Sequence, residues 1–534
     1  MLKNRVRLFL FSFLLILACK KENDRPQWKI QVVTPLMHAT LGVNNFIADS
    51  LTVTDSSNAI HLVYEDSLYS KLFDLDSLFR IPDTILPTVL TYPFTSLVLA
   101  ANTQFYSSNQ NATLSISGAE LREVIIKSGF LRIETRNHLQ TRVHYIYTIP
   151  GATRNGNAFQ FSTTMSAAPP GSVSTFTGLY DMSGYKIDLT GPAGNAVNTI
   201  SYNVAARTDT GVASINVFLG DTMVNLEAGL VDMVPYYAKG YLGQKEISED
   251  SSSSRFQFFN IIHSGHIRLE EVTLQMTIEN FIGVDAQAFI TRLQSINSPL
   301  NSYVNINSPS ILNHAININR ATESGNPLFP VIPSVTVVQF NNSNSNMRSL
   351  IENLPDQLNY GLRINVNPLG NISGSTDFIY SDYLVNARLK IDVPLSFAAD
   401  HLELADTSAF IIGNKEDFDP LGLGTFTLIA DNGFPFEAAL QLILLDEHNL
   451  FLDSIPVPSL IAAANTDANF KVIEPKRTKI PIYVDEARKQ RILKGNKISI
   501  HASFSTPLYP QYYRIYAGYK LDLKLVADVA YLIH

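Results

Sequence analysis

Apolar and polar residues alternate with a period of two along much of this chain. In residues 272–279 and 424–431, for example, every second side chain is apolar. Successive side chains of a strand point to opposite faces of a sheet, so this alternation predicts half-buried β-strands. The best helix candidates, residues 347–353 and 484–493, are both short. The pattern therefore predicts an all-β chain with few short helices.

Three of the predicted strands run into an asparagine that is followed by an alternating pattern of mostly apolar residues. These asparagines are Asn137, Asn280 and Asn432, which lie 143 and 152 residues apart, and a further strand candidate follows each. Asparagine tolerates left-handed backbone and its side chain can bond neighbouring amides, so each is expected to turn the chain between two strands. The recurrence of this arrangement predicts tandem β-sandwich-like units.

The recurrence also predicts which side chains are buried. Ile282 and Val284 follow Asn280 at the spacing at which Phe434 and Phe436 follow Asn432. Because alternate residues of a strand share one face, we expect all four side chains to lie in the core at the start of a strand.

A second internal match, at a constant offset of 136 residues, pairs Tyr380 and Tyr383 with Tyr516 and Tyr519. Residues three apart in a strand point to opposite faces, so half of these tyrosines are expected to be exposed. Exposed tyrosines would offer rigid contact area to a protein or glycan partner. Ordinary packing between cross-strand neighbours is the alternative interpretation.

The start of the chain has the features of a secretory signal. Basic Lys3, Arg5 and Arg7 precede an apolar run over residues 8–17 that is too short to span a bilayer. The end of this run and the two residues after it, Ile16, Leu17, Ala18 and Cys19, resemble the lipobox of bacterial lipoproteins. The resemblance implies cleavage before Cys19, a diacylglycerol on its thiol and a further acyl chain, such as palmitate, on its amine.

The residues after Cys19 bear on where such a lipoprotein would lie. Lys21 is followed by Glu22 and Asp24, a pattern that resembles the export signal of Bacteroidetes-type lipoproteins. The resemblance implies an anchor in the outer membrane and exposure at the cell surface, whereas an ordinary solvated linker is the alternative interpretation. Cys19 is the only cysteine, so no disulfide within the chain supports the fold.

The length suggests several domains after removal of the signal peptide. The expected organisation is a signal peptide over residues 1–18, a tether over 19–27, an N-terminal β cap over 28–110, and β units over 111–250, 251–400 and 401–534.

The strand, asparagine and strand of each unit resemble the water-stress and hypersensitive-response domain of late-embryogenesis proteins. That domain is an immunoglobulin-like sandwich whose strand pair carries a similar asparagine. Its usual proline after the asparagine is replaced here by His138, Phe281 and Gly433. The resemblance implies a sandwich for each unit.

Composition excludes some classes of function. Hydrophobic residues make up 46% of the chain and charged ones 16%, which excludes a disordered chain. The net charge of -8 and the lack of clustered Lys and Arg argue against nucleic acid as a partner. Residues 84–119 carry no charge at all, which is typical of strands with hydroxyls facing water or of a surface that touches lipid or a partner.

The chain carries none of the standard catalytic signatures that we sought, such as a hydrolase elbow, a phosphate loop or HExxH. His263 and His266 would face opposite sides of a strand, and the acidic run at 416–419 lacks the full spacing of a calcium loop. Asp446, Glu447 and His448 are expected to form a polar hairpin turn. No catalytic, cofactor-binding or metal-ligating residue is therefore assigned, and the sequence favours a protein that is not an enzyme.

The sequence thus predicts a non-catalytic, lipid-anchored envelope protein that contacts a protein or glycan partner. A glycan-acting hydrolase with carboxylates brought together from distant loops is one alternative. A lipid-binding envelope protein, suggested by the uncharged residues 84–119, is another. A helical, starch-binding lipoprotein is disfavoured because it would need long helices and an aromatic platform, and the chain has one tryptophan.

Overall fold

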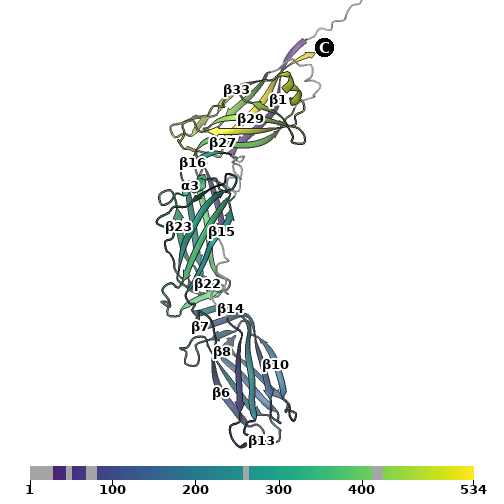
Figure 1. The fold of residues 1–534 in the computed structure, drawn as a ribbon, viewed down its shortest axis with the longest axis vertical. Coiled ribbons are helices and arrows are strands. Elements are labelled where there is room, and N and C mark those ends of the chain that lie inside the picture. Colours follow the sequence, from purple (N-terminus) through teal and green to yellow (C-terminus); the bar gives the residue numbers. More distant parts are fainter. Residues whose placement is uncertain (1–27, 44–50, 68–80, 257–263, 412–424, 534) are drawn as a thin grey trace, which may run out of the picture. The chain divides into compact units, whose positions relative to one another are not determined.

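The computed structural model describes residues 28–43, 51–67, 81–256, 264–411 and 425–533, and these form an all-β fold of antiparallel sheets (Figure 1). The predicted fold class is confirmed. The described part of the chain contains two short α-helices, α3 (Met347–Glu352) and α5 (Glu486–Ile492), and both lie within the two predicted helix ranges.

The chain divides into two compact units whose segments alternate along the sequence. Unit 1 comprises residues 1–62, 258–271 and 393–534, and unit 2 comprises residues 63–257 and 272–392. The first described strand pairs with the last one, with Val32 opposite Val529. Residues of the expected N-terminal cap therefore contribute strands to both units.

Unit 1 is built from two main sheets. One has the strand order β1-β36-β28-β33 and the other has the order β16-β27-β34-β29-β30, with β35 beside β27. The strands are β1 (Trp28–Gly42), β16 (Ser264–Leu269), β27 (Ser396–Ala409), β28 (Thr425–Asn432), β29 (Glu437–Leu445), β30 (Phe451–Pro456), β33 (Lys476–Tyr483), β34 (Lys497–Ser505), β35 (Tyr513–Arg514) and β36 (Lys520–Ile533). Short pairs add β2 (Thr52–Thr54), against the first residues of β3, and β31 (Asn465–Thr466) against β32 (Val472–Glu474).

One part of unit 2 is a ten-stranded sheet with the main path β25-β14-β7-β11-β8-β12-β6, to which β4, β9 and β10 are added. Its strands are β4 (Thr84–Thr91), β6 (Gln104–Thr113), β7 (Glu120–Asn137), β8 (Val143–Arg154), β9 (Asn157–Met165), β10 (Ser174–Asp181), β11 (Lys186–Asp188), β12 (Thr199–Thr208), β14 (Thr222–Tyr241) and β25 (Asp377–Tyr380). A separate pair consists of β5 (Ser96–Leu99) and β13 (Ile215–Phe218).

The other part of unit 2 contains two further sheets, which we name after their inner strands. The β24 sheet consists of β15 (Lys245–Arg255), β24 (Gln357–Val366), β18 (Ala286–Asn297), β19 (Ser302–Asn305) and β20 (Ile316–Ile318). The unit 2 strands of the β17 sheet are β3 (Ile60–Ser67), β26 (Val385–Pro394), β17 (Thr273–Asn280) and β23 (Ser334–Phe340). A hairpin of β21 (Thr322–Asn326) and β22 (Phe329–Ile332) lies beyond β20 in the chain.

The three asparagines make the same set of hydrogen bonds. The side-chain oxygen of Asn432 accepts the N–H of Phe434 at 2.9 Å, and its amide nitrogen donates to the carbonyl oxygens of Phe436 and Ala462 at 2.8 and 2.9 Å. Asn137 and Asn280 bond the equivalent backbone groups two and four residues ahead, and a third carbonyl further along the chain. All three side chains are buried, as expected for groups whose bonds replace those to water.

These asparagines fix the direction of the chain where it leaves one strand and enters the next. Asn280 ends β17 and Asn432 ends β28, and in both cases the following strand belongs to another sheet. The predicted burial of Ile282, Val284, Phe434 and Phe436 is confirmed, since none is more than 4% exposed.

The expectation for the paired tyrosines is wrong. Tyr380 and Tyr383 lie at the two ends of a turn, in which the N–H of Tyr383 donates to the carbonyl of Tyr380. The centroids of their two rings are 6.3 Å apart. Tyr516 and Tyr519 have the same arrangement with a ring separation of 5.5 Å. None of the four is exposed. The short residues between each pair turn the chain, so both rings come to the same side.

Candidate functional site

In unit 2, the β24 sheet and the β17 sheet border a cavity of about 550 Å³ that is partly open to solvent. Most of its wall is aliphatic and comes from the inward positions of β17, β18, β24 and β26. The lining residues of these strands include Leu274, Met276, Ile278, Ala286, Ala288, Ile290, Leu293, Leu358, Leu362, Ile364, Val385, Ala387 and Leu389. An apolar space of this size, partly open to solvent, falls in the range of about 300–1,000 Å³ that is usual for ligand sites.

The space exists because the side chains after Asn280 are small. The eighth residue after the asparagine is Ala288 in the cavity wall, but Tyr145 after Asn137 and Leu440 after Asn432. All three side chains point inward and are buried. The same strand geometry is therefore compatible with a much larger residue than the alanine that stands at the cavity.

Aromatic rings fill the corresponding part of unit 1. Phe434 packs against Phe504 at 5.9 Å between ring centroids, and Phe436 packs against Phe397 at 5.1 Å. At the positions of these two phenylalanines, the cavity wall has Ile282 and Val284. The smaller side chains at these two positions, together with Ala288, explain why a cavity lies between these two sheets of unit 2, whereas aromatic rings fill the equivalent place in unit 1.

Polar groups gather where two edge strands border the cavity. The lining includes Tyr64 and Asp66 of β3 and Glu249, Ser252 and Ser254 of β15. The Tyr64 hydroxyl and the Ser254 hydroxyl both donate to Asp66 Oδ2 at 3.2 Å, and the Ser252 hydroxyl donates to Glu249 Oε1 at 2.6 Å. We call these five residues the polar rim.

Packing against a neighbouring ring holds Tyr64 in place in the polar rim. Its ring packs edge-to-face against the buried Phe256 ring at 5.0 Å. Burial raises the pKa of the Tyr64 phenol, and the negative charge of Asp66 adds to this effect. The hydroxyl therefore stays protonated at neutral pH and remains a hydrogen-bond donor.

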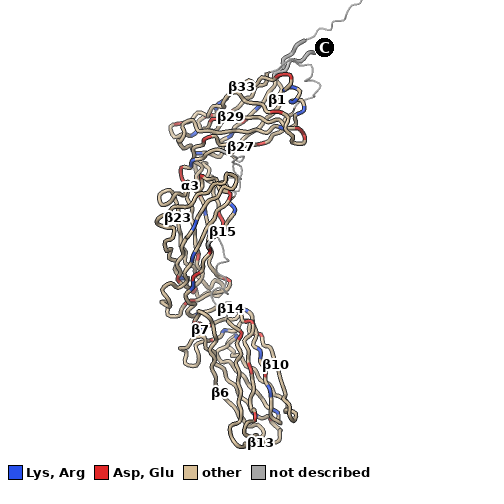
Figure 2. The backbone as a smooth tube through the Cα atoms, viewed as in Figure 1, with Lys and Arg blue, Asp and Glu red and all other residues tan. Residues whose placement is uncertain are grey.

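The charges of the cavity lining have one sign. Asp66 and Glu249 are acidic, and the described residues of the lining include no lysine, arginine or histidine. Elsewhere on the described strands, acidic and basic residues are interspersed (Figure 2), as in the ion pairs of Glu134 with Arg132 and Arg136. The cavity thus offers a hydrogen-bond acceptor or a negative charge at its rim, and aliphatic surface inside.

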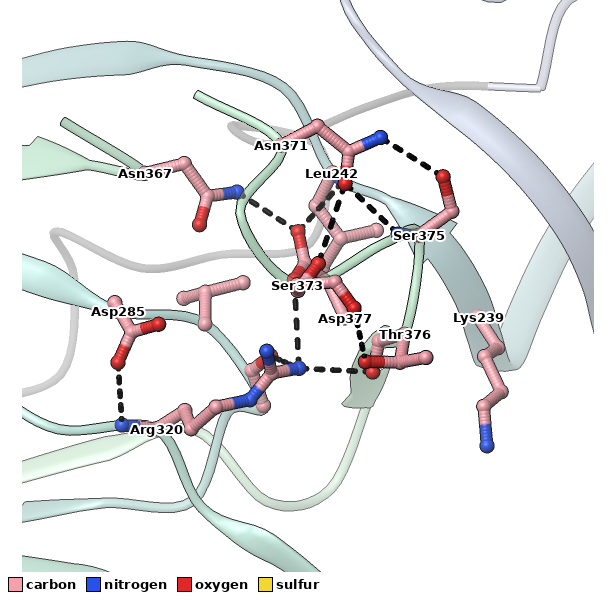
Figure 3. A network of polar contacts seen from close by, with 12 residues as sticks. Lys239, Leu242, Asp285, Arg320, Asn367, Asn371, Ser373, Ser375, Thr376 and Asp377 are labelled. Carbon is pink, nitrogen blue, oxygen red and sulfur yellow. Dashed lines mark hydrogen bonds and ion pairs between the residues drawn. The ribbon is translucent and has the colours of Figure 1, made fainter. Parts of the chain in front are cut away.

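A second polar cluster in unit 2 has a structural role (Figure 3). Asp377 is 1% exposed and accepts hydrogen bonds from the N–H of Leu242, the amide of Asn367 and the guanidinium of Arg320 at 3.1, 2.8 and 3.4 Å. Arg320 also donates to the carbonyl of Gly283 at 2.7 Å. These bonds satisfy the buried carboxylate and hold the chain at the start of β18, which forms part of the cavity wall.

The structure places the candidates from the sequence as follows. Cys19, His263 and the acidic run at 416–419 lie outside the described residues. Asp446 forms the predicted hairpin turn, because its carboxylate accepts the N–H groups of His448 and Leu450 at 2.8 Å. Within the described ranges, no group of three or more His, Cys, Asp or Glu side chains is arranged to hold a metal ion.

The described part of the chain contains the two α-helices α3 and α5. None of the helices found there combines the length and the hydrophobicity needed to cross a bilayer.

Sequence reasoning did not find the cavity. The signal that could have indicated it is the size of the side chains at matched distances from each asparagine, where Ala288 stands against Tyr145 and Leu440. Alternation alone shows that such positions face inward, but it does not show whether the space between two sheets is filled.

No protein-family model matches this chain, and no curated protein matches it either. Among solved structures, it is similar to a presumed secreted protein of Parabacteroides distasonis ATCC 8503, with 8% identity, a TM-score of 0.29, and coverage of 93% of this chain and 99% of that one. A chain of Broad bean stain virus is similar with 10% identity, a TM-score of 0.17, and coverage of 62% and 91%. Both TM-scores are too low to support an argument about fold or function.

Proposed function

We propose that this chain is a non-catalytic, lipid-anchored protein of the bacterial cell envelope that binds an apolar ligand in the cavity of unit 2. The observation that supports this function is the aliphatic cavity of about 550 Å³. Aliphatic side chains that line a pocket partly open to solvent make fewer packing contacts than side chains of a filled core. A ligand that fills the space would recover those contacts and would be held by the hydrophobic effect.

The sequence alone predicted a protein or glycan partner. The aliphatic lining of the cavity favours an apolar ligand instead. A sugar needs many polar groups to replace the water that its hydroxyls lose on binding. The inner wall offers aliphatic side chains such as Leu274, Ile290 and Leu389, and its polar groups lie mainly at the rim. The lipid-binding alternative fits this lining better than glycan binding or glycan hydrolysis.

Filling the cavity is the direct test of the proposed function. Ala288→Leu introduces the residue that unit 1 has at the equivalent position, and we expect it to weaken binding of the neutral dye N-phenyl-1-naphthylamine by at least about tenfold. The dye's fluorescence rises in apolar surroundings, so a titration of the mature protein reports occupancy. Far-ultraviolet circular dichroism checks that the variant is folded.

The matched control is Ala439→Leu, the same change at an exposed position of β29 in unit 1. It should leave the dye titration unchanged. Saturable dye binding of equal affinity in the wild type and in Ala288→Leu would place the dye elsewhere and contradict the proposal, as would the absence of saturable binding in the wild type.

The anchor is tested separately. Since Cys19 is the only cysteine, Cys19→Ser should abolish incorporation of labelled palmitate fed to expressing cells and release the protein from the membrane fraction. A serine in place of the cysteine keeps the size of the side chain but removes the thiol that would be acylated. Incorporation that persists in Cys19→Ser would show that the lipid is attached elsewhere.

A further inference from the structure

We infer that the ligand of the cavity is a long-chain amphiphile with a positively charged amine head group, which binds at Asp66 and Glu249 while its alkyl chain fills the aliphatic interior. This inference rests on the proposed function and specifies the chemistry of the ligand. It follows from the position, the partners and the charges of the polar rim.

The rim carboxylates are positioned to accept hydrogen bonds from a ligand. Asp66 receives its two hydrogen bonds from Tyr64 and Ser254 on Oδ2, and Glu249 receives the bond from Ser252 on Oε1. A carboxylate can accept about four hydrogen bonds, so both retain capacity for an ammonium group, which has three donors. The existing bonds hold the two side chains in place on β3 and β15.

The hydroxyl groups of the rim also favour a ligand that donates hydrogen bonds. Ser252 and Ser254 donate their single hydroxyl hydrogens to the carboxylates, and the Tyr64 hydroxyl donates to Asp66 Oδ2 at 3.2 Å, with the carbonyl oxygen of Arg255 as a second acceptor at 3.5 Å. Their hydroxyl oxygens can then only accept further hydrogen bonds. The rim as a whole is therefore rich in acceptors, which suits a head group that donates hydrogen bonds.

The described residues of the rim offer no positive charge to an anionic head group. Among the residues that the structure describes, the lining has two carboxylates and no lysine, arginine or histidine. A fatty-acid carboxylate or a phosphate would be repelled by Asp66 and Glu249, and a low-dielectric wall strengthens this repulsion. An ammonium head is attracted by the same field, and an uncharged alcohol head gains little from it.

The test is competition between amphiphiles that share a ten-carbon chain. Decylamine, decanol and decanoate are titrated against N-phenyl-1-naphthylamine bound to the mature protein at about pH 7, where the amine is protonated and the acid is ionised. We expect decylamine to displace the dye at a concentration at least about tenfold lower than decanol, the value of one charge-assisted hydrogen bond. Decanoate should be the weakest competitor.

The double variant Asp66→Asn/Glu249→Gln keeps the size of the rim but removes its charge. We expect it to bind decylamine and decanol within about threefold of each other while its affinity for decanol stays unchanged. The matched control is Glu65→Gln/Glu246→Gln, which removes two charges from exposed positions of the same two strands outside the cavity lining. This control should keep the preference for decylamine.

The outcomes separate the inference from the proposed function. If decanoate competes as well as decylamine, or if the rim double variant keeps the preference for the amine, the head-group inference is wrong although the cavity still binds apolar chains. If no alkyl compound displaces the dye, or if Ala288→Leu does not weaken binding of the dye, the proposed function itself is wrong, and the inference about the head group is wrong with it.

Discussion

Truncation of Phe434 to alanine should lower the free energy of unfolding of unit 1 by about 3–5 kcal/mol. The side chain is 2% exposed, and its ring lies at 5.9 Å from that of Phe504 and at 6.2 Å from that of Tyr519. The change removes apolar surface from the core and leaves a space that neighbours on different sheets cannot close without moving the strands. Hydrogen exchange of the amides in β28 and β36 measures the loss within this unit.

A matched control is available in the same unit. Phe451, on β30, is 65% exposed, so Phe451→Ala removes the same atoms from a position with little burial. It should change the stability by less than about 0.5 kcal/mol. Equal losses for Phe434→Ala and Phe451→Ala would contradict the assignment of Phe434 to the core.

The sequence predicted those features that depend on neighbouring residues. Alternation identified the strands, and the asparagine turns followed from side chains that bond backbone groups two and four residues ahead. The short helices α3 and α5 also lie in their predicted ranges. Each of these features is local, so the information that specifies it lies within about ten residues.

Features that depend on distant segments were not found in the sequence. The pairing of β1 with β36 joins the two ends of the described chain, and no local pattern specifies such a partner. The tyrosine prediction was wrong because a spacing of three was interpreted as a strand, whereas Ser381 and Asp382 form a turn. In that case turn-forming residues outweighed the strand pattern around them.

The cavity depends both on residues close to Asn280 and on strands that are distant in the sequence. That Ala288 faces inward could be predicted from its place after Asn280. The cavity beside it, however, is also lined by β26 and β24, which lie about a hundred and about seventy residues further along the chain. The polar rim has the same origin, since Asp66 and Glu249 belong to strands that are distant in the sequence. A ligand site made by two facing sheets therefore required the structure.

Removal of the asparagine side chains provides the second large effect. Asn432→Ala should destabilise unit 1 by about 2–5 kcal/mol, because the side chain is fully buried and makes three hydrogen bonds to the backbone. Alanine would leave the N–H of Phe434 and two carbonyl oxygens without these partners, in a place closed to water. Asn137→Ala removes an equivalent set of bonds in unit 2 and should have an effect of similar size.

The control for both variants is Asn109→Ala on β6, where the asparagine is exposed and its side chain bonds Asn203 alone among the described side chains. We expect a change below about 0.5 kcal/mol there. Urea unfolding followed by hydrogen exchange assigns each loss to its own unit. If Asn432→Ala and Asn137→Ala are no more destabilising than Asn109→Ala, the asparagines do not fix the strand-to-strand connections. In that case the alignment of Ala288 with Tyr145 and Leu440, on which the explanation of the cavity depends, would lose its physical basis.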